Sequence, residues 1–177
     1  MSENRESAGS LQEFVAGVSA PIVVFDKHLD VVAANEIAGA VSASFAVGVN
    51  LARFTFLNPM VEETTDDWAS AAAMTASSLR ASLEHYDEDQ RFRELVGDLM
   101  THSAAFAEQW AAASPTATPQ SGVSVFSNPL VGVLRLAYEQ LRRPVPDEYT
   151  YILWAPVDPE SADRLARLQG ILRSDAG

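Results

Sequence analysis

The chain has 177 residues, of which 47% are hydrophobic and 20% charged, so its composition is that of a globular protein with length for about one domain. Its net charge of −12 argues against binding to nucleic acid, and the absence of cysteine excludes disulfides, a thiol nucleophile and thiolate metal ligands. The sequence shows neither a signal peptide pattern nor the roughly 18 successive apolar residues of a membrane span, so a cytoplasmic protein without membrane contact is expected.

The first predicted elements are a short helix and a β-hairpin. Residues 1–9 are polar and predict a disordered tail, after which Ser10 can cap a helix with one apolar face. Runs rich in β-branched residues follow at 20–26 and 30–35, and the polar segment between them predicts a hairpin. Asn35 ends the second strand and can cap the next helix, because its side-chain oxygen can accept a backbone N–H.

Apolar periodicity then predicts a long helix in the middle of the chain. Thr64 or Thr65 can cap it, with Asp66 and Asp67 in its first turn, and it runs to about Tyr86. One stripe of this helix is predicted to be buried and consists of Trp68, Ala72, Thr75, Leu79 and Leu83. Because this stripe is rich in small residues, it leaves space beside Trp68 that other groups must fill.

Two more helices are expected after it. Asp87 with Gln90 resembles a capping box for the first of them. Its predicted buried positions are Phe92, Leu95, Val96, Leu99 and Met100. Ser103 starts the second helix, in which Phe106 and Trp110 stand one turn apart and can stack on the same partner.

The last third of the chain is predicted to be mostly strands. A polar surface loop at 114–122 precedes two strands that join at Asn128 and Pro129. Leu134, Leu136 and Tyr138 are interpreted as a sign of a bulge or of a strand covered on both faces.

A further strand at 148–157 precedes a final amphipathic helix. In the strand, Tyr149, Tyr151 and Leu153 face one way and Ile152 and Trp154 the other; in the helix the apolar positions are Leu165, Leu168 and Leu172. Two strands, helices and three strands predict an α+β fold, a PAS-like antiparallel sheet with helices gathered on one side and an enlarged helical insertion packed on one face. One domain at 10–173 is expected.

The succession of "APIVVFDKHLDVVAAN", "NLARFTFLNP", "DDWASAAAMTASSLRA", "RFRELVGDLMTHSAAFAEQWA", "SNPLVGVLRLAYEQL" and "YTYILWAPVDPES" resembles the C-terminal ligand-binding domain of MmyB-like, XRE-type bacterial transcription regulators. The resemblance covers roughly residues 10–162. It implies a PAS-like fold, a pocket for a small apolar molecule of fatty-acid type, and a helix-turn-helix domain ahead of the sensor.

Individual positions carry this resemblance. They are Arg53, Phe56, Pro59, Asp67, Trp68, Arg80, Ser103, Phe106 and Trp110. The chain departs from the family at Asn58, where aspartate is usual, and at Asn128, where histidine is usual. Residues 1–9 are too few for a helix-turn-helix, so no direct contact with nucleic acid is expected. Either the chain is a stand-alone sensor or its start lies inside a longer gene.

The predicted ligand-binding residues are Arg53, Phe56, Trp68, Met74, Phe106, Trp110 and Tyr138. Each has an alternative structural explanation. Arg53 can pair with a ligand carboxylate in a dry pocket, or it can simply tether an acidic neighbour. The aromatic residues can form the walls of a cavity or belong to the ordinary core.

Catalytic and metal-binding signatures are missing from the sequence. No GxSxG, GxGxxG or Walker motif is present, so an enzyme is not expected. His28, His85 and His102 lack a second ligand at metal spacing and are predicted to lie on the surface. Neither a cofactor nor a metal ion is expected.

The leading hypothesis is a sensor domain that binds a hydrophobic, fatty-acid-like molecule between sheet and helices and passes on a conformational change. The alternative is a dimerisation or protein-docking module without a small ligand, in which Trp110, Trp154 and the last helix face a second chain. Both functions can coexist, and a homodimer is compatible with either.

Overall fold

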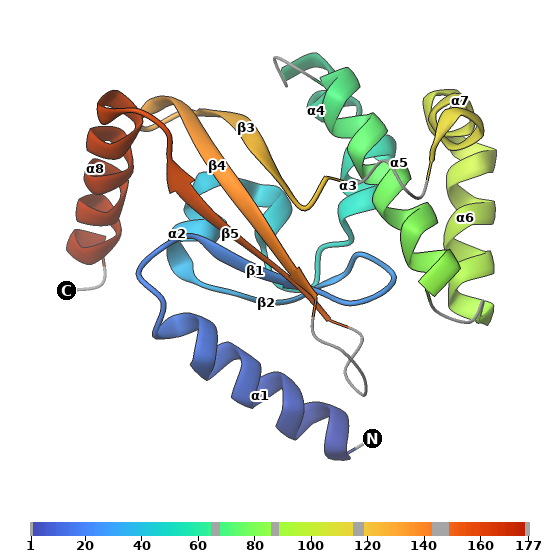
Figure 1. Ribbon diagram of the computed structural model, residues 1–177, viewed down its shortest axis with the longest axis horizontal. Helices are drawn as coiled ribbons and strands as arrows, with labels where there is room; N and C mark the ends of the chain where they lie inside the picture. The colour runs from blue at the N-terminus through green and yellow to red at the C-terminus, as the bar shows by residue number, and fades with distance from the viewer. Residues whose placement is uncertain (1, 65–67, 86–88, 115–118, 143–148, 176–177) are drawn as a thin grey trace.

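The computed structural model describes residues 2–64, 68–85, 89–114, 119–142 and 149–175, which form a sheet surrounded by helices (Figure 1). The strands are β1 (Ile22–Phe25), β2 (Val31–Ala34), β3 (Ser121–Asn128), β4 (Gly132–Arg142) and β5 (Thr150–Pro156). The helices are α1 (Ser2–Ala16), α2 (Glu36–Val41), the 3-10 helix η1 (Ala43–Phe45), α3 (Leu51–Leu57), α4 (Pro59–Thr64), α5 (Trp68–His85), α6 (Gln90–His102), α7 (Ala104–Ala112) and α8 (Pro159–Asp175). None of these helices is long and apolar enough to span a membrane.

The sheet has the strand order β2-β1-β5-β4-β3, and every neighbouring pair is antiparallel. Pairing of β1 with β5 joins the N-terminal hairpin to the C-terminal strands, so segments far apart in the sequence form one sheet. Helices α3 to α7 make up the insertion between them. The predicted α+β class is confirmed, and the arrangement is consistent with a PAS-like fold with a helical insertion.

Alternation along β4 puts Leu134, Leu136 and Tyr138 on one buried face. The pairing of β4 with β3 runs without a shift along the whole of β3. Both expected explanations are therefore wrong: the three residues follow the two-residue period of a regular strand without a bulge, and the opposite face of β4 is exposed at Val133, Arg135 and Glu139 rather than covered. The irregularity lies in the hairpin, between Val24 and Phe25 of β1.

The two faces of the sheet pack against different helices. On the inner face, α2 and α8 cover an apolar cluster called here the sheet core. Its buried sheet residues are Val23, Phe25, Val31, Ala34, Leu134, Leu136, Tyr138 and Trp154, with Ile152 half-buried beside them. Leu165 and Leu168 of α8 are buried in this core, as predicted, and the two faces of β5 are assigned correctly.

Helix α1 packs on the opposite, outer face, where Leu11 and Val15 contact the β1–β2 hairpin. The expectation that the helices gather on one side of the sheet is therefore wrong for α1. The helix also begins at Ser2 rather than at Ser10. An amphipathic pattern read only from residue 10 onward gave no sign of the preceding turns.

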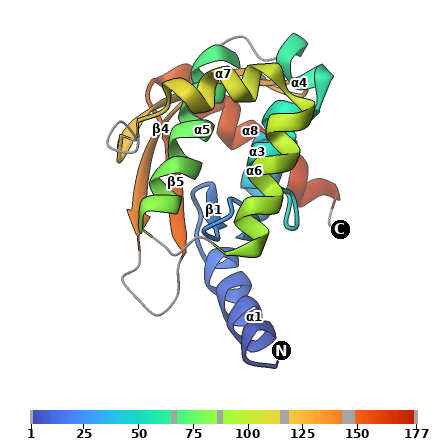
Figure 2. The ribbon, with the colours of Figure 1, turned by 90° about the vertical axis from the view of Figure 1, so that its right-hand side faces the viewer.

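The insertion stands beside the sheet and has an apolar core of its own, called here the insertion core (Figure 2). Its buried members include Phe56, Ala72, Ala76, Leu79, Phe92, Leu95, Leu99 and Phe106. The stripe predicted on α5 faces this core, with Trp68 and Leu83 half-buried at its two ends. Met100, which was predicted to join the core, is instead exposed on α6.

Polar side chains fix where most of these helices begin. Asn35 caps α2 by accepting the N–H of Ala38, and Ser103 caps α7 by accepting the N–H of Phe106, both as predicted. Asn50 caps α3, a helix that periodicity did not reveal. The cap of α6 is Asp89 rather than the predicted box, and Asp87 lies outside the described residues.

The predicted start of the long helix is covered only in part. Thr64 is the last residue of α4, and the predicted cap and acidic turn at 65–67 lie outside the described residues. The described part of α5 begins at Trp68. Residues 115–118 of the predicted surface loop also lie outside the described residues, and β3 already begins at Ser121.

The turn between β1 and β2 connects the sheet to the insertion. His28 lies in this turn and is buried, so its predicted surface position is wrong, whereas His102 is exposed as predicted. Nε2 of His28 lies 3.0 Å from both carboxylate oxygens of Asp89 at the start of α6. The hydroxyl of Ser82 on α5 donates to the carbonyl of Lys27 at 2.6 Å. The side chain of His85 is not described.

Candidate ligand-binding site

Helix α5 presents two different rows of side chains, one to each neighbour. The first row enters the insertion core. The second is composed of Ala71, Met74, Ser78 and Ser82, spaced by three or four residues so that they share a face. Met74 packs against the sheet core, and Ser78 and Ser82 share a hollow with sheet residues. The second row therefore faces the inner face of the sheet across a cleft.

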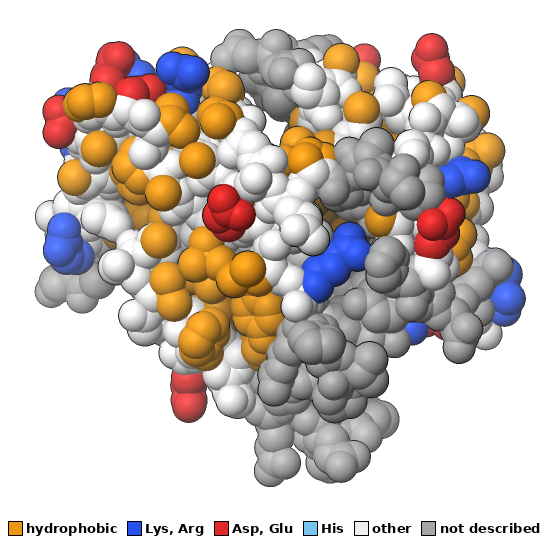
Figure 3. Space-filling view, in the orientation of Figure 1, with side chains coloured by type: hydrophobic (Ala, Val, Ile, Leu, Met, Phe, Trp, Pro, Cys, Tyr) orange, Lys and Arg blue, Asp and Glu red, His pale blue; other side chains and the backbone are white. Residues whose placement is uncertain are grey.

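This cleft is incompletely filled. Figure 3 shows the surface hollowed between the sheet and the insertion. A small hollow of about 50 Å³ lies at one end, lined by Phe25, Asp26, Leu29, Leu51, Ser78, Ser82, Gln140, Arg142, Thr150 and Ile152. Met74, Ser78 and Ile152 are half-buried although they lie between the two layers. The sheet core and the insertion core therefore remain separate, and side chains between them still have accessible surface.

A row of aromatic and small residues crosses the inner face near the cleft. Tyr138 lies between Gly122 on β3 and Trp154 on β5 in the strand register. Gly122 has no side chain, and a Cβ there would lie 2.9 Å from the Tyr138 ring, so glycine makes room for the ring. Burial raises the pKa of Tyr138 above its ordinary value. Among the described residues, the buried Nε1 of Trp154 has no hydrogen-bond partner.

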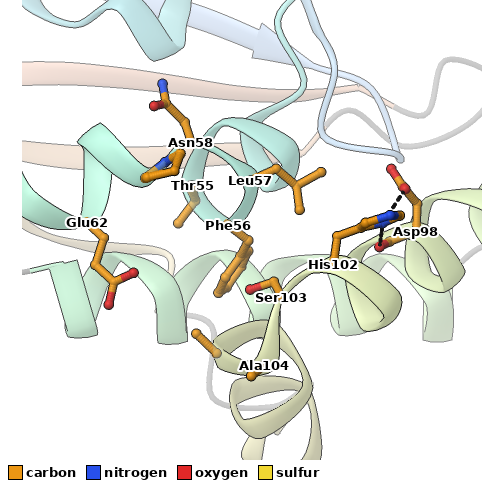
Figure 4. Close-up of a pocket in the computed structure, with 11 residues that line it drawn as sticks. Thr55, Phe56, Leu57, Asn58, Glu62, Asp98, His102, Ser103 and Ala104 are labelled. Carbon is orange, nitrogen blue, oxygen red and sulfur yellow. Dashed lines mark hydrogen bonds and ion pairs between the residues drawn. The ribbon is translucent and has the colours of Figure 1, made fainter.

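A second hollow of about 740 Å³ lies within the insertion, at the corner where α3 and α4 meet α6 and α7 (Figure 4). Its lining is Thr55, Phe56, Leu57, Asn58, Pro59, Glu62, Asp98, His102, Ser103, Ala104 and Ala105. Asp98 and His102 interact at one end, and the carboxylate of Glu62 lies at the other. The volume suits a small molecule, but two carboxylates on the wall suit an apolar acid poorly.

The structure gathers four of the predicted ligand residues in the insertion core. Phe56 lies edge-to-face against Trp68 and Phe106, with ring centroids 6.1 and 5.1 Å away. Phe106 and Trp110, which were predicted to stack on a common partner, instead stack on each other, with ring centroids 5.4 Å apart. The guanidinium of Arg80 lies over the Trp110 ring and donates to its carbonyl at 3.1 Å. These aromatic residues hold α3, α5 and α7 together.

The three other predicted residues lie apart. Arg53 is at the surface of the insertion, where it forms an ion pair with Asp98, the ordinary pairing considered as its alternative. Met74 and Tyr138 both belong to the sheet side of the cleft. Sequence reasoning missed Ser78, Ser82 and Ile152, although the second row on α5 was visible as a three-and-four spacing of small and polar residues.

The two residues that depart from the family pattern, Asn128 and Asn58, both form hydrogen bonds with the backbone. Asn128 is buried; its Nδ2 donates to the carbonyl of Ala40 at 2.6 Å, and its Oδ1 accepts from the N–H of Leu130. Asn58 accepts the N–H of Met60 at the start of α4. Both asparagines therefore hold turns in place.

Asp26, His28 and Asp30 bring three possible metal-ligating atoms within 4.8 Å of one another. These groups already have protein partners. Asp26 accepts the backbone N–H groups of His28 and Asp30, and Asp30 accepts from Asn50 and pairs with Arg91. The N–H of Phe92, followed by His28 and Lys27, holds the pKa of Asp89 well below its ordinary value. These contacts stabilise the β1–β2 turn, and they account for the cluster without a metal ion.

Comparison with protein families gives one finding. The family model described as the MmyB-like transcription regulator ligand binding domain matches residues 9–168. No curated protein matches the chain. The match covers most of the 177 residues, including the whole sheet and the insertion. The family is one of transcription-regulator ligand-binding domains and not of enzymes. The chain therefore belongs to the MmyB-like transcription regulator ligand-binding domain family.

Proposed function

We propose that the chain is a small-molecule sensor that binds a hydrophobic, fatty-acid-like ligand between the inner face of the sheet and α5. One observation carries the proposal: the sheet and the insertion have separate apolar cores, and the residues between them are only half-buried. A guest that covered Met74 and Ile152 would add apolar burial worth about 25 cal/mol per Å².

Binding in this place would move the insertion. The hollow of about 50 Å³ has room for little more than one water molecule, so an acyl chain requires α5 to shift away from the sheet. Because α5 is part of the insertion core, it would carry α3, α6 and α7 with it. Ligand binding would thereby change the conformation that a partner meets, which is the property a sensor needs.

Met74 and Tyr138 would contact the ligand in this proposal, together with Ser78 and Ile152. The four aromatic residues of the insertion core would act indirectly, by keeping the moving helices together. Arg53 would contact a ligand only at the hollow of about 740 Å³, called here the corner groove, whose lining includes its ion-pair partner Asp98. A sensor of this kind would form one domain over residues 10–173 and work in the cytoplasm.

The first experiment identifies the ligand and its chain length. Solvent extraction of the purified protein followed by mass spectrometry should release a lipid. Thermal-shift measurements with fatty acids of increasing length should show one preferred length, because a ligand at about 100 times its dissociation constant adds about 2.7 kcal/mol to the free energy of unfolding. If nothing is extracted and no length raises the melting temperature, the ligand proposal is wrong.

A pair of cavity-filling variants tests the place of binding. Ser78→Phe fills the cleft, whereas Ala104→Phe fills the corner groove from an exposed position. The cleft proposal expects Ser78→Phe to lose the ligand-induced shift and Ala104→Phe to keep it. The opposite result would mean that the ligand binds in the corner groove. Circular dichroism of both variants checks that they are folded.

The alternative function, docking of a second chain, was expected to use Trp110, Trp154 and the last helix. Trp154 and Leu168 are buried in the sheet core, and Trp110 is half-buried against Phe106. Trp154 and the apolar side of the last helix are thus covered by the chain's own residues, which leaves little of the expected surface for a second chain. A homodimer therefore needs another surface.

A further inference from the structure

The outer face of the sheet is largely uncovered beyond α1. Ten large apolar side chains are exposed among the described residues, and six of them lie on this face or beside it. They are Phe14 on α1, Val123 and Val125 on β3, Val133 and Leu141 on β4, and Val157 after β5. Figure 3 shows hydrophobic side chains gathered over β4, β5 and α1, with one acidic side chain among them. This outer patch is larger than scattered exposed residues would produce.

The outer patch is nearly free of charge. Along β3, β4 and β5, the outward positions carry two charged side chains, Arg135 and Glu139. One is positive and one negative, so the outward positions of these strands add no net charge, in a chain whose net charge is −12. Two copies of such an acidic chain repel each other over most of their surfaces. At this face the repulsion is smallest.

The two charges are placed symmetrically about Ala137 on the same strand. Ala137 lies in register between Val123 and Ala155, so the middle of the patch is flat and made of small residues. Consider two copies that face each other across a two-fold axis that runs between the sheets, perpendicular to β4, and passes over Ala137. Position 135 of each copy then faces position 139 of the other, and two opposite-charge pairs form.

We propose that the outer patch is the interface of a homodimer in which a second copy of this chain packs sheet against sheet. The pattern of one arginine and one glutamate about a central alanine is complementary to itself under that two-fold rotation, which an unrelated partner would not require. Packing of the β3–β4 parts of the two sheets at about 10 Å would bury the four apolar side chains on these strands, while α1, which covers the outer face at the β1–β2 end, lies outside this contact. Within the chain, Arg135 pairs with Asp158, whose carboxylate lies 3.4 Å away, so Glu139 of the second copy would approach a guanidinium that already has one acidic neighbour.

A charge-swap series tests this arrangement. Arg135→Glu alone and Glu139→Arg alone each place like charges opposite one another, so each should raise the dimer dissociation constant about tenfold or more. The double variant Arg135→Glu with Glu139→Arg should restore dimerisation. Mixing the two single variants should give a heterodimer, which native mass spectrometry distinguishes from either homodimer by mass. The proposed geometry is wrong if the single variants dimerise as tightly as wild type, or if the two single variants do not form a heterodimer when mixed.

A second pair of variants tests the apolar contact. Val125→Glu changes a residue of the outer patch that is 45% exposed, and Met100→Glu changes a residue of α6 that is 46% exposed. Analytical ultracentrifugation should show that the first variant is a monomer and the second a dimer. A wild-type chain that stays monomeric at every concentration measured, or a Val125→Glu dimer as tight as the wild type, contradicts the proposal.

This inference is independent of the ligand site, which lies on the other face of the sheet. The thermal shift caused by fatty acids should be the same for Val125→Glu and for wild type. Conversely, Ser78→Phe should sediment as a dimer. Failure of one proposal therefore leaves the other standing.

Discussion

Asn35 shows how much structure a single side chain can determine. It is buried after β2, and its Oδ1 accepts the N–H groups of Ile22 and Ala38, while its Nδ2 donates to the carbonyls of Val18 and Ala20. One amide thus caps α2 and fastens the chain entering β1. The cap was predictable from the sequence because asparagine after a strand favours a helix start. The contacts 13 to 17 residues away were not.

Replacement of Asn35 by alanine should therefore destabilise the protein more than the loss of a surface cap would. The variant loses the helix cap and leaves buried carbonyls unpaired, so the free energy of unfolding should fall by about 2–4 kcal/mol. Asn58→Ala is the matched control, because Asn58 makes one hydrogen bond near the surface. Urea denaturation of both variants gives the comparison, and equal effects would contradict the structural role of Asn35.

The raised pKa of Asp26 should make the stability of the protein depend on pH. Burial raises the pKa of its carboxyl group, with the nearby Asp30 adding to the effect, so the folded state disfavours the charged form. For an acid with a raised pKa, stability falls as the pH rises from the ordinary value toward the folded one, and the loss persists above it. Asp26→Asn removes the charge and keeps an oxygen for the N–H groups of His28 and Asp30.

Asp26→Asn should consequently melt at a higher temperature than wild type at pH 7, and the difference should shrink below pH of about 4, where the wild-type carboxyl is neutral too. Asp26→Ala is the contrast. It loses both hydrogen bonds and should be less stable by about 2 kcal/mol at either pH. Melting curves at several pH values decide the matter, and a destabilised Asp26→Asn at pH 7 would show that the charge is needed.

At the scale of elements, two glycines have opposite roles. Gly122 in β3 lies against the Tyr138 ring, and an added Cβ would lie 2.9 Å from it. Gly97 is exposed in the middle of α6, with no atom within 4 Å of an added Cβ. We expect Gly122→Ala to lower the free energy of unfolding by about 1–3 kcal/mol through crowding. Gly97→Ala should raise it by about 0.5–1 kcal/mol, because alanine favours helix.

Chemical denaturation of the two glycine variants checks this prediction. A stable Gly122→Ala protein would mean that the Tyr138 ring has another position, and the cleft would then be wider than described. The prediction for Gly97 depends only on helix propensity, so it also tests whether α6 is formed in solution.

The success of the element predictions followed the strength of each local pattern. The hairpin, α5 and β5 were predictable because their apolar residues repeat with a clear period. Helices α3 and α4 have 7 and 6 residues, too few turns for a period to appear, and only the cap at Asn50 marked the first of them. Met100 fits the period of α6 but is 46% exposed, because none of the elements that the structure describes covers that part of the helix.

The candidate site was predicted less well than the fold, for a physical reason. The aromatic residues Phe56, Trp68, Phe106 and Trp110 were expected to line a pocket, but aromatic residues at helical spacing pack equally well on one another. Sequence patterns show which face of a helix is apolar. They do not show which apolar cluster a second face of the same helix will contact. On α5 that second face meets the sheet core, and its residues Ser78 and Ser82 were therefore not predicted.

At the scale of the whole molecule, the sheet and the insertion are linked through the β1–β2 turn. The turn offers backbone carbonyls to Asn50 and Ser82 and the His28 ring to Asp89. The ring also lies 5.6 Å from that of Phe92, at the edge of the insertion core. Leu51 packs against both cores and Met74 of α5 against the sheet core, so the turn adds the polar contacts that hold the insertion against the sheet while α5 gives way to a ligand.

His28→Ala should therefore loosen the insertion while the sheet remains formed. We expect a loss of about 2–4 kcal/mol, because the variant creates a cavity and removes the partner of Asp89. Hydrogen exchange should speed up across α5 and α6 more than in β3–β5. His102→Ala is the control: that ring is exposed, its ion pair with Asp98 is on the surface, and its loss should change stability by less than about 0.5 kcal/mol. Uniformly faster exchange in sheet and insertion would mean that the two cores unfold as one unit, and ligand binding could then not shift the insertion alone.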